Sequence, residues 1–168
     1  MSLFRVYVLD SNVFIQAACT YYAFDLLPPF WQALIRHAES GQIVSVDRVR
    51  DEINHMNDTL AGWANTEFHR WFMSTTQPDV IEEYRRIMVW ASNQNQFSGA
   101  AKAEFARADN ADAWVVAYAK AKGHSVVTHE QLHPDIKHRI PIPNACQAFG
   151  VEYVDTFQML RTLGVRLG

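Results

Sequence analysis

Short apolar segments alternate with helical segments along the chain, and this alternation restricts the fold more than any other feature of the sequence. Residues 5–9, 42–46, 125–128 and 151–154 are rich in Val, Ile or Tyr and have the composition of buried β-strands. Helical segments lie between them, which predicts βαβ units. We therefore expect an α/β fold with a central, mainly parallel sheet of about four to five strands flanked by helices.

The helices are indicated by apolar residues at helical spacing and by residues typical of helix ends. Asp47 and Asp155 are good N-caps, and Gly41 and Gly123 stand where a helix should end. The predicted helices cover residues 12–19, 30–40, 48–56, 113–119, 144–149 and 155–163.

One long stretch, from about residue 59 to residue 107, is expected to be wholly helical and to form an insertion in the domain. Pro78 and residues 92–96 predict two breaks in it. Its many aromatic side chains are expected to pack against one another rather than to stack on nucleic-acid bases.

Length and composition indicate one globular domain over residues 1–168. The apolar fraction of 49% and the charged fraction of 20% are those of an ordinary soluble protein. The net charge of −3 gives no basic field typical of nucleic-acid binders, so any such binding has to be local or bridged by a metal ion. Cys19 and Cys146 lie too far apart for a zinc ribbon or a disulfide framework. The sequence shows no signal peptide, transit peptide or long apolar run, which predicts a cytoplasmic protein without membrane contact.

Four carboxylates fall at positions that this layout sends to one edge of the sheet. Asp10 and Glu130 follow predicted strands, Glu52 lies early on the helix after the second strand, and Asp112 begins the helix before the third. In parallel sheets ligands bind at the carboxyl ends of the strands. Acids gathered there without a matching Lys or Arg cluster repel one another unless a cation joins them. Mg²⁺ or Mn²⁺ suits such oxygen ligands, and such a site can activate water and hold a phosphate for attack.

Each acid also has an ordinary structural explanation. Asp10, Ser11, Asp109 and Asp112 are residue types that cap helices, and Glu52 suits a solvated helix face. Capping does not explain why the acids converge, so we favour the metal site. Asp109 is a further candidate ligand, although a cap is its more common role.

Three motifs, in order, resemble those of PIN-domain (VapC-toxin-like) nucleases. Residues 10–15 are similar to the family's D-S/T-N-V-L/F-I/L opening, residues 112–119 to its D-A-x-I/L-A/V-A-x-A helix and residues 126–130 to its L/V-V-T-x-D strand end. Glu52 falls where the family has its second acid. The resemblance covers essentially the whole chain. The aromatic loop from Tyr21 to Trp31 and residues 142–146 are similar to a PIN-like branch grouped with toxin-like proteins.

The resemblance implies a single PIN-like domain and a metal-dependent endoribonuclease that hydrolyses RNA with a metal-activated water. It implies Mg²⁺ or Mn²⁺ as cofactor, with the ligands Asp10, Glu52, Asp112 and Glu130. Glu130 stands where the family usually has Asp, so the number of metal ions, one or two, stays open.

Further residues enter through the same resemblance. Ser11, Asn12 and Thr128 are the implied donors that orient carboxylates and water. The branch resemblance alone brings Tyr22 and Asp25 to the cleft.

Family analogy also implies partners: an RNA substrate, a small antitoxin protein that restrains the chain as a toxin, and a second copy in a homodimer. A different class of function stays open, a non-catalytic PIN-like module that binds RNA or a protein. The presence of acids at all four positions argues against that alternative.

Two other chemistries are disfavoured by the residues around them. The run His129-Glu130-Gln131-Leu132-His133 matches the HExxH pattern of zinc hydrolases, with Glu152 as a downstream third ligand. Together with His138 the histidines form an alternative candidate, a zinc site in a loop, although surface histidines are the more common case. That pattern requires a helix, whereas the β-branched run before it and Pro134 after it predict a strand and a loop. An aspartyl phosphatase would need a second Asp where this chain has Asn12, and no phosphate-binding glycine loop occurs.

Overall fold

The computed structural model describes residues 5–20, 22–56 and 58–167. Tyr21, at the start of the predicted aromatic loop, lies outside the described residues, as do residues 1–4, 57 and 168. Within the described ranges, no helix has the length and apolar character needed to cross a membrane.

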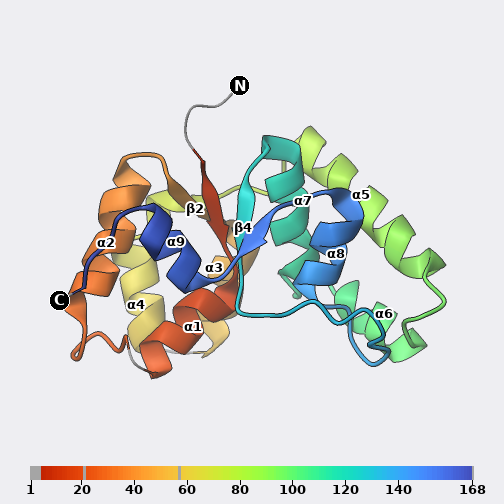
Figure 1. Ribbon diagram of the computed structural model, residues 1–168, viewed down its shortest axis with the longest axis horizontal. Coiled ribbons are helices and arrows are strands. Elements are labelled where there is room, and N and C mark those ends of the chain that lie inside the picture. Colours follow the sequence, from red (N-terminus) through yellow and green to blue (C-terminus); the bar gives the residue numbers. More distant parts are fainter. Residues whose placement is uncertain (1–4, 21, 57, 168) are drawn as a thin grey trace.

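A five-stranded, all-parallel sheet forms the centre of the molecule, which confirms the α/β prediction (Figure 1). The strand order is β3-β2-β1-β4-β5, so the first strand lies in the middle. The strands are β1 (Tyr7–Leu9), β2 (Ile43–Val46), β3 (Phe72–Met73), β4 (Ser125–Val127) and β5 (Tyr153–Val154). Short strands of Val, Ile, Leu and Tyr suit this position because a parallel sheet covered by helices buries both faces.

Helices lie on both sides of the strands. In Figure 1, α1, α2, α4 and α9 gather on one side, and α5, α7 and α8 on the other. Helix α7 is buried over residues 113–119 and packs against α5, α8 and the central strands. The helices are α1 (Ser11–Cys19), α2 (Pro28–Glu39), α3 (Asp47–Met56), α4 (Asp58–Thr66), α5 (Pro78–Asn93), α6 (Gly99–Phe105), α7 (Asp112–Lys122), α8 (Ile142–Phe149) and α9 (Thr156–Thr162), with one 3₁₀ turn, η1 (His69–Trp71).

The expectation that residues 59–107 are wholly helical is wrong. The stretch contains η1 and the edge strand β3, which pairs with β2 through Ser45 and Phe72. The local sequence fits a helix or a strand equally well, and the pairing with β2 decides between them. Pro78 does not break a helix but begins α5, where its missing N–H costs nothing. The break predicted at 92–96 is confirmed, since α5 ends at Asn93 and α6 begins at Gly99.

The middle of the sheet fixes the geometry of the candidate site. β1 pairs in parallel with β4, so that Leu9 lies opposite Val127, and the Asp10 N–H donates to the Val127 carbonyl at 3.0 Å. The two chain segments then leave the sheet at the same edge. Residues 10 and 128–130, far apart in sequence, are therefore neighbours.

Candidate functional site

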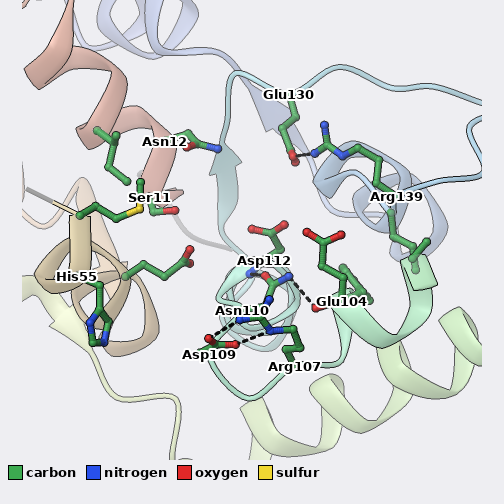
Figure 2. A pocket seen from close by; sticks show the side chains of 16 residues that line it. Ser11, Asn12, His55, Glu104, Arg107, Asp109, Asn110, Asp112, Glu130 and Arg139 are labelled. Carbon is green, nitrogen blue, oxygen red and sulfur yellow. Dashed lines mark hydrogen bonds and ion pairs between the residues drawn. The ribbon is translucent and has the colours of Figure 1, made fainter. Parts of the chain in front are cut away.

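An acidic cavity of about 460 Å³ opens at the carboxyl edge of the sheet (Figure 2). Side chains from α1, α3, α6, α7 and the segment after β4 line it. The acidic lining residues are Glu52, Glu104, Asp109, Asp112 and Glu130. Three of the four predicted acids therefore reach one cavity, and the fourth, Asp10, is fully buried and does not line it.

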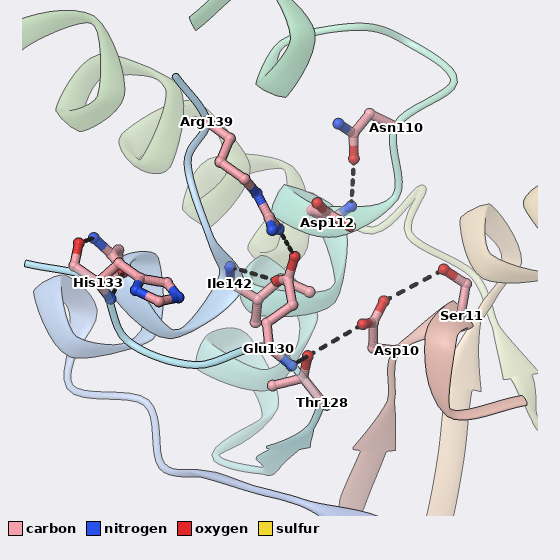
Figure 3. A network of polar contacts seen from close by, with 10 residues as sticks. Asp10, Ser11, Asn110, Asp112, Thr128, Glu130, His133, Arg139 and Ile142 are labelled. Atoms are coloured by element: carbon pink, nitrogen blue, oxygen red, sulfur yellow. Dashed lines mark hydrogen bonds and ion pairs between the residues drawn. The ribbon is translucent and has the colours of Figure 1, made fainter. Parts of the chain in front are cut away.

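Asp10 is completely buried at the end of β1. It holds the N-cap position of α1, but its side chain makes no capping hydrogen bond. Its carboxylate accepts hydrogen bonds from Thr128 Oγ1 at 3.2 Å and from Ser11 Oγ at 3.4 Å (Figure 3). Burial, and then the nearby charge of Glu52, raise the pKa of Asp10 from 3.8 to about 6.

Asp112 occupies the first turn of α7, where the helix N-terminus favours a negative charge. The local capping is done by Asn110, whose Oδ1 accepts from the Asp112 N–H at 2.9 Å, so the Asp112 carboxylate is free of that task. Burial, followed by the charges of Asp10 and Glu52, raises the pKa of Asp112 well above its usual value.

Glu52 is placed by α3, which begins directly after β2. Its Oε1 accepts from the Ala111 N–H at 3.1 Å, which joins α3 to the start of α7. Burial raises the pKa of Glu52, and the nearby charge of Asp109 raises it further. The charge of Glu52 thus raises the pKa of both Asp10 and Asp112, and the charge of Asp10 raises that of Asp112 further.

Glu130 has a different environment, at the side of the cavity formed by the segment after β4 (Figure 3). Its Oε1 pairs with Arg139 Nη2, and its Oε2 accepts from the Ile142 N–H at 2.8 Å. The Glu130 N–H donates to Thr128 Oγ1 at 3.1 Å, and this hydroxyl in turn donates to Asp10. Thr128 therefore links the two acids that follow β1 and β4.

The remaining predicted residues lie at varying distances from this group. Ser11 touches Asp10, and the exposed Asn12 lines the cavity. Asp109 lies at the exposed rim, where it pairs with Arg107 at 2.7 Å.

The described part of the aromatic loop, residues 22–31, does not line the acidic cavity. Tyr22 instead stacks on Phe30 with ring centroids 4.5 Å apart, and Asp25 is exposed. The link between this loop and the cleft thus has no support from the cavity lining.

Sequence reasoning missed five polar residues of the cavity: His55, Glu104, Arg107, Asn110 and Arg139. Asn110 stands directly before a predicted helix, and its residue type is a capping signal. Glu104 and Arg139 carry no such local signal, because α6 and the irregular segment before α8 reach the cavity only through the tertiary fold.

The histidine run 129–133 forms no helix, as predicted. β4 ends at Val127, and the next helix along the chain, α8, begins at Ile142. His129 Nε2 is hydrogen-bonded to Thr156 Oγ1 at 3.0 Å, and Glu152 pairs with Arg5 at 2.9 Å. His129 and Glu152 therefore each bind a partner of their own.

Fit to a metal ion depends on the donor chemistry at Asp10, Glu52 and Asp112. In the described ranges, no three His, Cys, Asp or Glu side chains are arranged so closely that they could hold an ion by themselves. Mg²⁺ usually keeps several waters and is bound through one or two carboxylates together with substrate phosphates. Asp10 and Asp112, whose pKa values are raised by burial and by neighbouring negative charges, fit that requirement, since a cation would relieve both effects.

Comparison with known proteins adds one finding on ancestry. A search of curated proteins finds no match to the chain. A family model described as "Domain of unknown function (DUF4411)" matches residues 7–167, a span that contains all five strands and every acid of the cavity. The chain therefore belongs to the DUF4411 family.

Proposed function

We propose that the chain is a metal-dependent endoribonuclease whose Asp10, Glu52 and Asp112 hold Mg²⁺ or Mn²⁺ together with waters and the RNA phosphate. The observation that carries the proposal is that Glu52 and Asp112 line one cavity next to the buried Asp10 at the carboxyl edge of a parallel sheet, where the charge of Glu52 raises the pKa of Asp10 and Asp112. A fully buried carboxylate next to other carboxylates is among the groups that destabilise a folded protein most. Perturbed acids that line a cavity are typical of functional sites.

The chemistry required of the chain is modest. A bound divalent cation would supply a water of lowered pKa and would neutralise charge on the phosphate. The Thr128 and Ser11 hydroxyls hold the Asp10 carboxylate in one orientation, and the Ala111 N–H does so for Glu52. The site contains these oriented carboxylates and needs no nucleophilic side chain.

The choice of RNA as substrate rests on the resemblance to PIN-domain nucleases. The same resemblance supports three further proposals: that the chain is cytoplasmic, that it acts as a toxin restrained by a small antitoxin, and that it forms a homodimer. A net charge of −3 makes a metal-bridged or locally basic grip on RNA necessary.

The first test is cleavage of a mixed pool of structured and single-stranded RNA by the purified chain, with Mn²⁺ or with EDTA. Wild type is expected to cut only with Mn²⁺. Asp10→Asn and Glu52→Gln are expected to lose at least about a hundredfold in rate, because each removes a ligand charge while it keeps the shape. Calorimetry measures Mn²⁺ binding by the same proteins.

A matched control exists beside Glu52. Asp51 lies one residue earlier on α3, is exposed, and is absent from the lining of the acidic cavity. Asp51→Asn should therefore cut RNA like wild type. Wild-type protein that neither binds Mn²⁺ nor cuts RNA would refute the proposed function and favour the non-catalytic binding module.

A further inference from the structure

The Glu130 carboxylate is fully engaged by its own chain. Its side chain is only 12% exposed. One oxygen pairs with Arg139 and the other accepts from the Ile142 N–H, a backbone group that α8 fixes in place. Glu130 thereby differs from Asp112, whose carboxylate accepts no hydrogen bond from any described residue.

Arg139 faces the cavity from the other side of this ion pair. Its side chain is 42% exposed and lines the cavity together with Glu52 and Asp112. In Figure 3 the Arg139 guanidinium points toward the region between Glu130 and Asp112. Among the described residues, only Glu130 accepts a hydrogen bond from Arg139, so its other N–H groups are available.

Arg107, the second arginine in the cavity lining, is arranged differently. Its Nε and Nη2 both bind Asp109, at 2.9 and 2.7 Å, and it lies at the exposed rim (Figure 2). Arg139 instead is anchored through one nitrogen from behind. Arg139 therefore presents a fixed positive charge to the cavity, because no carboxylate among the described residues binds its guanidinium through two nitrogens.

We infer that Arg139 binds a phosphate of the RNA substrate beside Asp112, and that Glu130 serves as the anchor of Arg139 rather than as a metal ligand. A guanidinium matches the oxygen geometry of a phosphodiester, and charge-assisted hydrogen bonds of this kind are strong. A fixed cation among acids also explains how an acidic chain accepts a polyanion. The inference rests on the proposed function, since it names a substrate contact of that site.

The test separates RNA binding from cleavage. Fluorescence anisotropy with a labelled single-stranded RNA is measured in EDTA, in an Asp10→Asn background that does not cut. Adding Arg139→Gln should weaken RNA binding roughly tenfold and reduce the slope of log affinity against log salt by about 0.7. Arg139→Lys should keep the slope while affinity falls by a smaller factor, because the charge stays and the planar fork is lost.

The control is Arg86→Gln, in an exposed arginine of α5 that pairs with Glu82 and Glu83 outside the cavity. Equal affinity and salt slope for Arg139→Gln and Arg86→Gln would overturn the inference, as would the absence of RNA binding by every variant. If Arg139→Gln does not fold, Glu130→Gln takes its place in the test. This variant should bind RNA several-fold more weakly than wild type, because Arg139 loses its anchor.

Calorimetry tests the anchor role of Glu130. Glu130→Gln should keep an Mn²⁺ affinity much closer to that of wild type than Asp10→Asn does, because it removes no metal ligand. A loss as large as that of Asp10→Asn would make Glu130 a metal ligand and overturn the inference. Failure of the proposed function is seen separately, as wild-type protein that binds no Mn²⁺ and cuts no RNA.

Discussion

Asp10 is a carboxylate without exposed surface, and the hydroxyls of Thr128 and Ser11 only partly replace its lost hydration. The pKa of Asp10 is raised to about 6 because burial disfavours the charged form of the carboxylate. An acid whose pKa is higher in the folded state binds protons more tightly when folded. Stability from this group is therefore present at low pH and is lost as pH rises through the folded pKa.

Asp10→Asn should accordingly stabilise the metal-free protein at neutral pH. Relative to wild type, its free energy of unfolding should rise by on the order of 3 kcal/mol between about pH 4 and pH 7.5, because the variant has no charge to bury. Urea unfolding in EDTA at several pH values measures this difference. A difference that does not vary with pH would show that Asp10 titrates normally.

Thr128 supplies a hydroxyl that donates to Asp10 and accepts from the Glu130 N–H. Thr128→Val keeps the shape but removes both interactions, so Mn²⁺ affinity should fall at least roughly tenfold. Thr128→Ser keeps the hydroxyl and is expected to bind Mn²⁺ nearly as well as wild type. Calorimetry measures the Mn²⁺ affinity of wild type and both variants. Equal losses of affinity in Thr128→Val and Thr128→Ser would show that the packing of this side chain matters and its hydroxyl does not.

At the scale of elements, α7 connects the site to the core. Its first residue is Asp112, its middle is buried, and it ends at Gly123 in the left-handed conformation with φ +72°. Gly123 allows the chain to turn directly into β4, which carries Thr128 at its end. The turn thus sets the position of two site residues on neighbouring elements.

Gly123→Ala should lower the free energy of unfolding by roughly 1–2 kcal/mol, although an added Cβ would meet no atom within 4 Å. The cost lies in the backbone conformation alone. Gly62, inside α4, is equally free of contacts but helical, so Gly62→Ala should instead stabilise by roughly 0.5–1 kcal/mol. Urea unfolding of both variants distinguishes conformation from steric contact, since a steric effect would give them the same sign.

The elements also show where sequence reasoning succeeds. β1, β2, β4 and β5 and the helices beside them carry strong local signals, namely apolar runs, caps and C-terminal glycines, and the structure has them within a few residues of the expected positions. β3 has only two residues, Phe72 and Met73, and exists because β2 offers an open edge. A pairing between distant segments leaves no periodic trace in a sequence.

The same contrast holds for the cavity. Acids at strand ends are predictable, because a parallel sheet sends all its carboxyl ends to one edge. Arg139 and Glu104 are not, because they come from an irregular segment and a short helix whose positions depend on tertiary packing. The sequence therefore indicates a negative cavity, and the structure adds the positive charge within it.

For the whole molecule, the proposed metal site predicts a linkage between Mn²⁺ and global stability. Mn²⁺ at about a hundred times its dissociation constant should raise the melting temperature by about 5–10 °C relative to EDTA, because the ion binds only the folded state. Thermal unfolding followed by circular dichroism measures the shift. Asp10→Asn should show no shift, and an equal shift in both proteins would place Mn²⁺ elsewhere on the molecule.

The strand order has a consequence for synthesis on the ribosome. β1 is made first but lies between β2 and β4, and residues 10 and 128 meet only when almost the whole domain has been made. Until then the nascent chain carries an unpaired edge on its central strand, which invites chaperone binding or aggregation. An incomplete chain also lacks Asp112, Thr128 and Arg139. A translating cell would therefore be exposed to the assembled cavity only after release of a nearly finished domain.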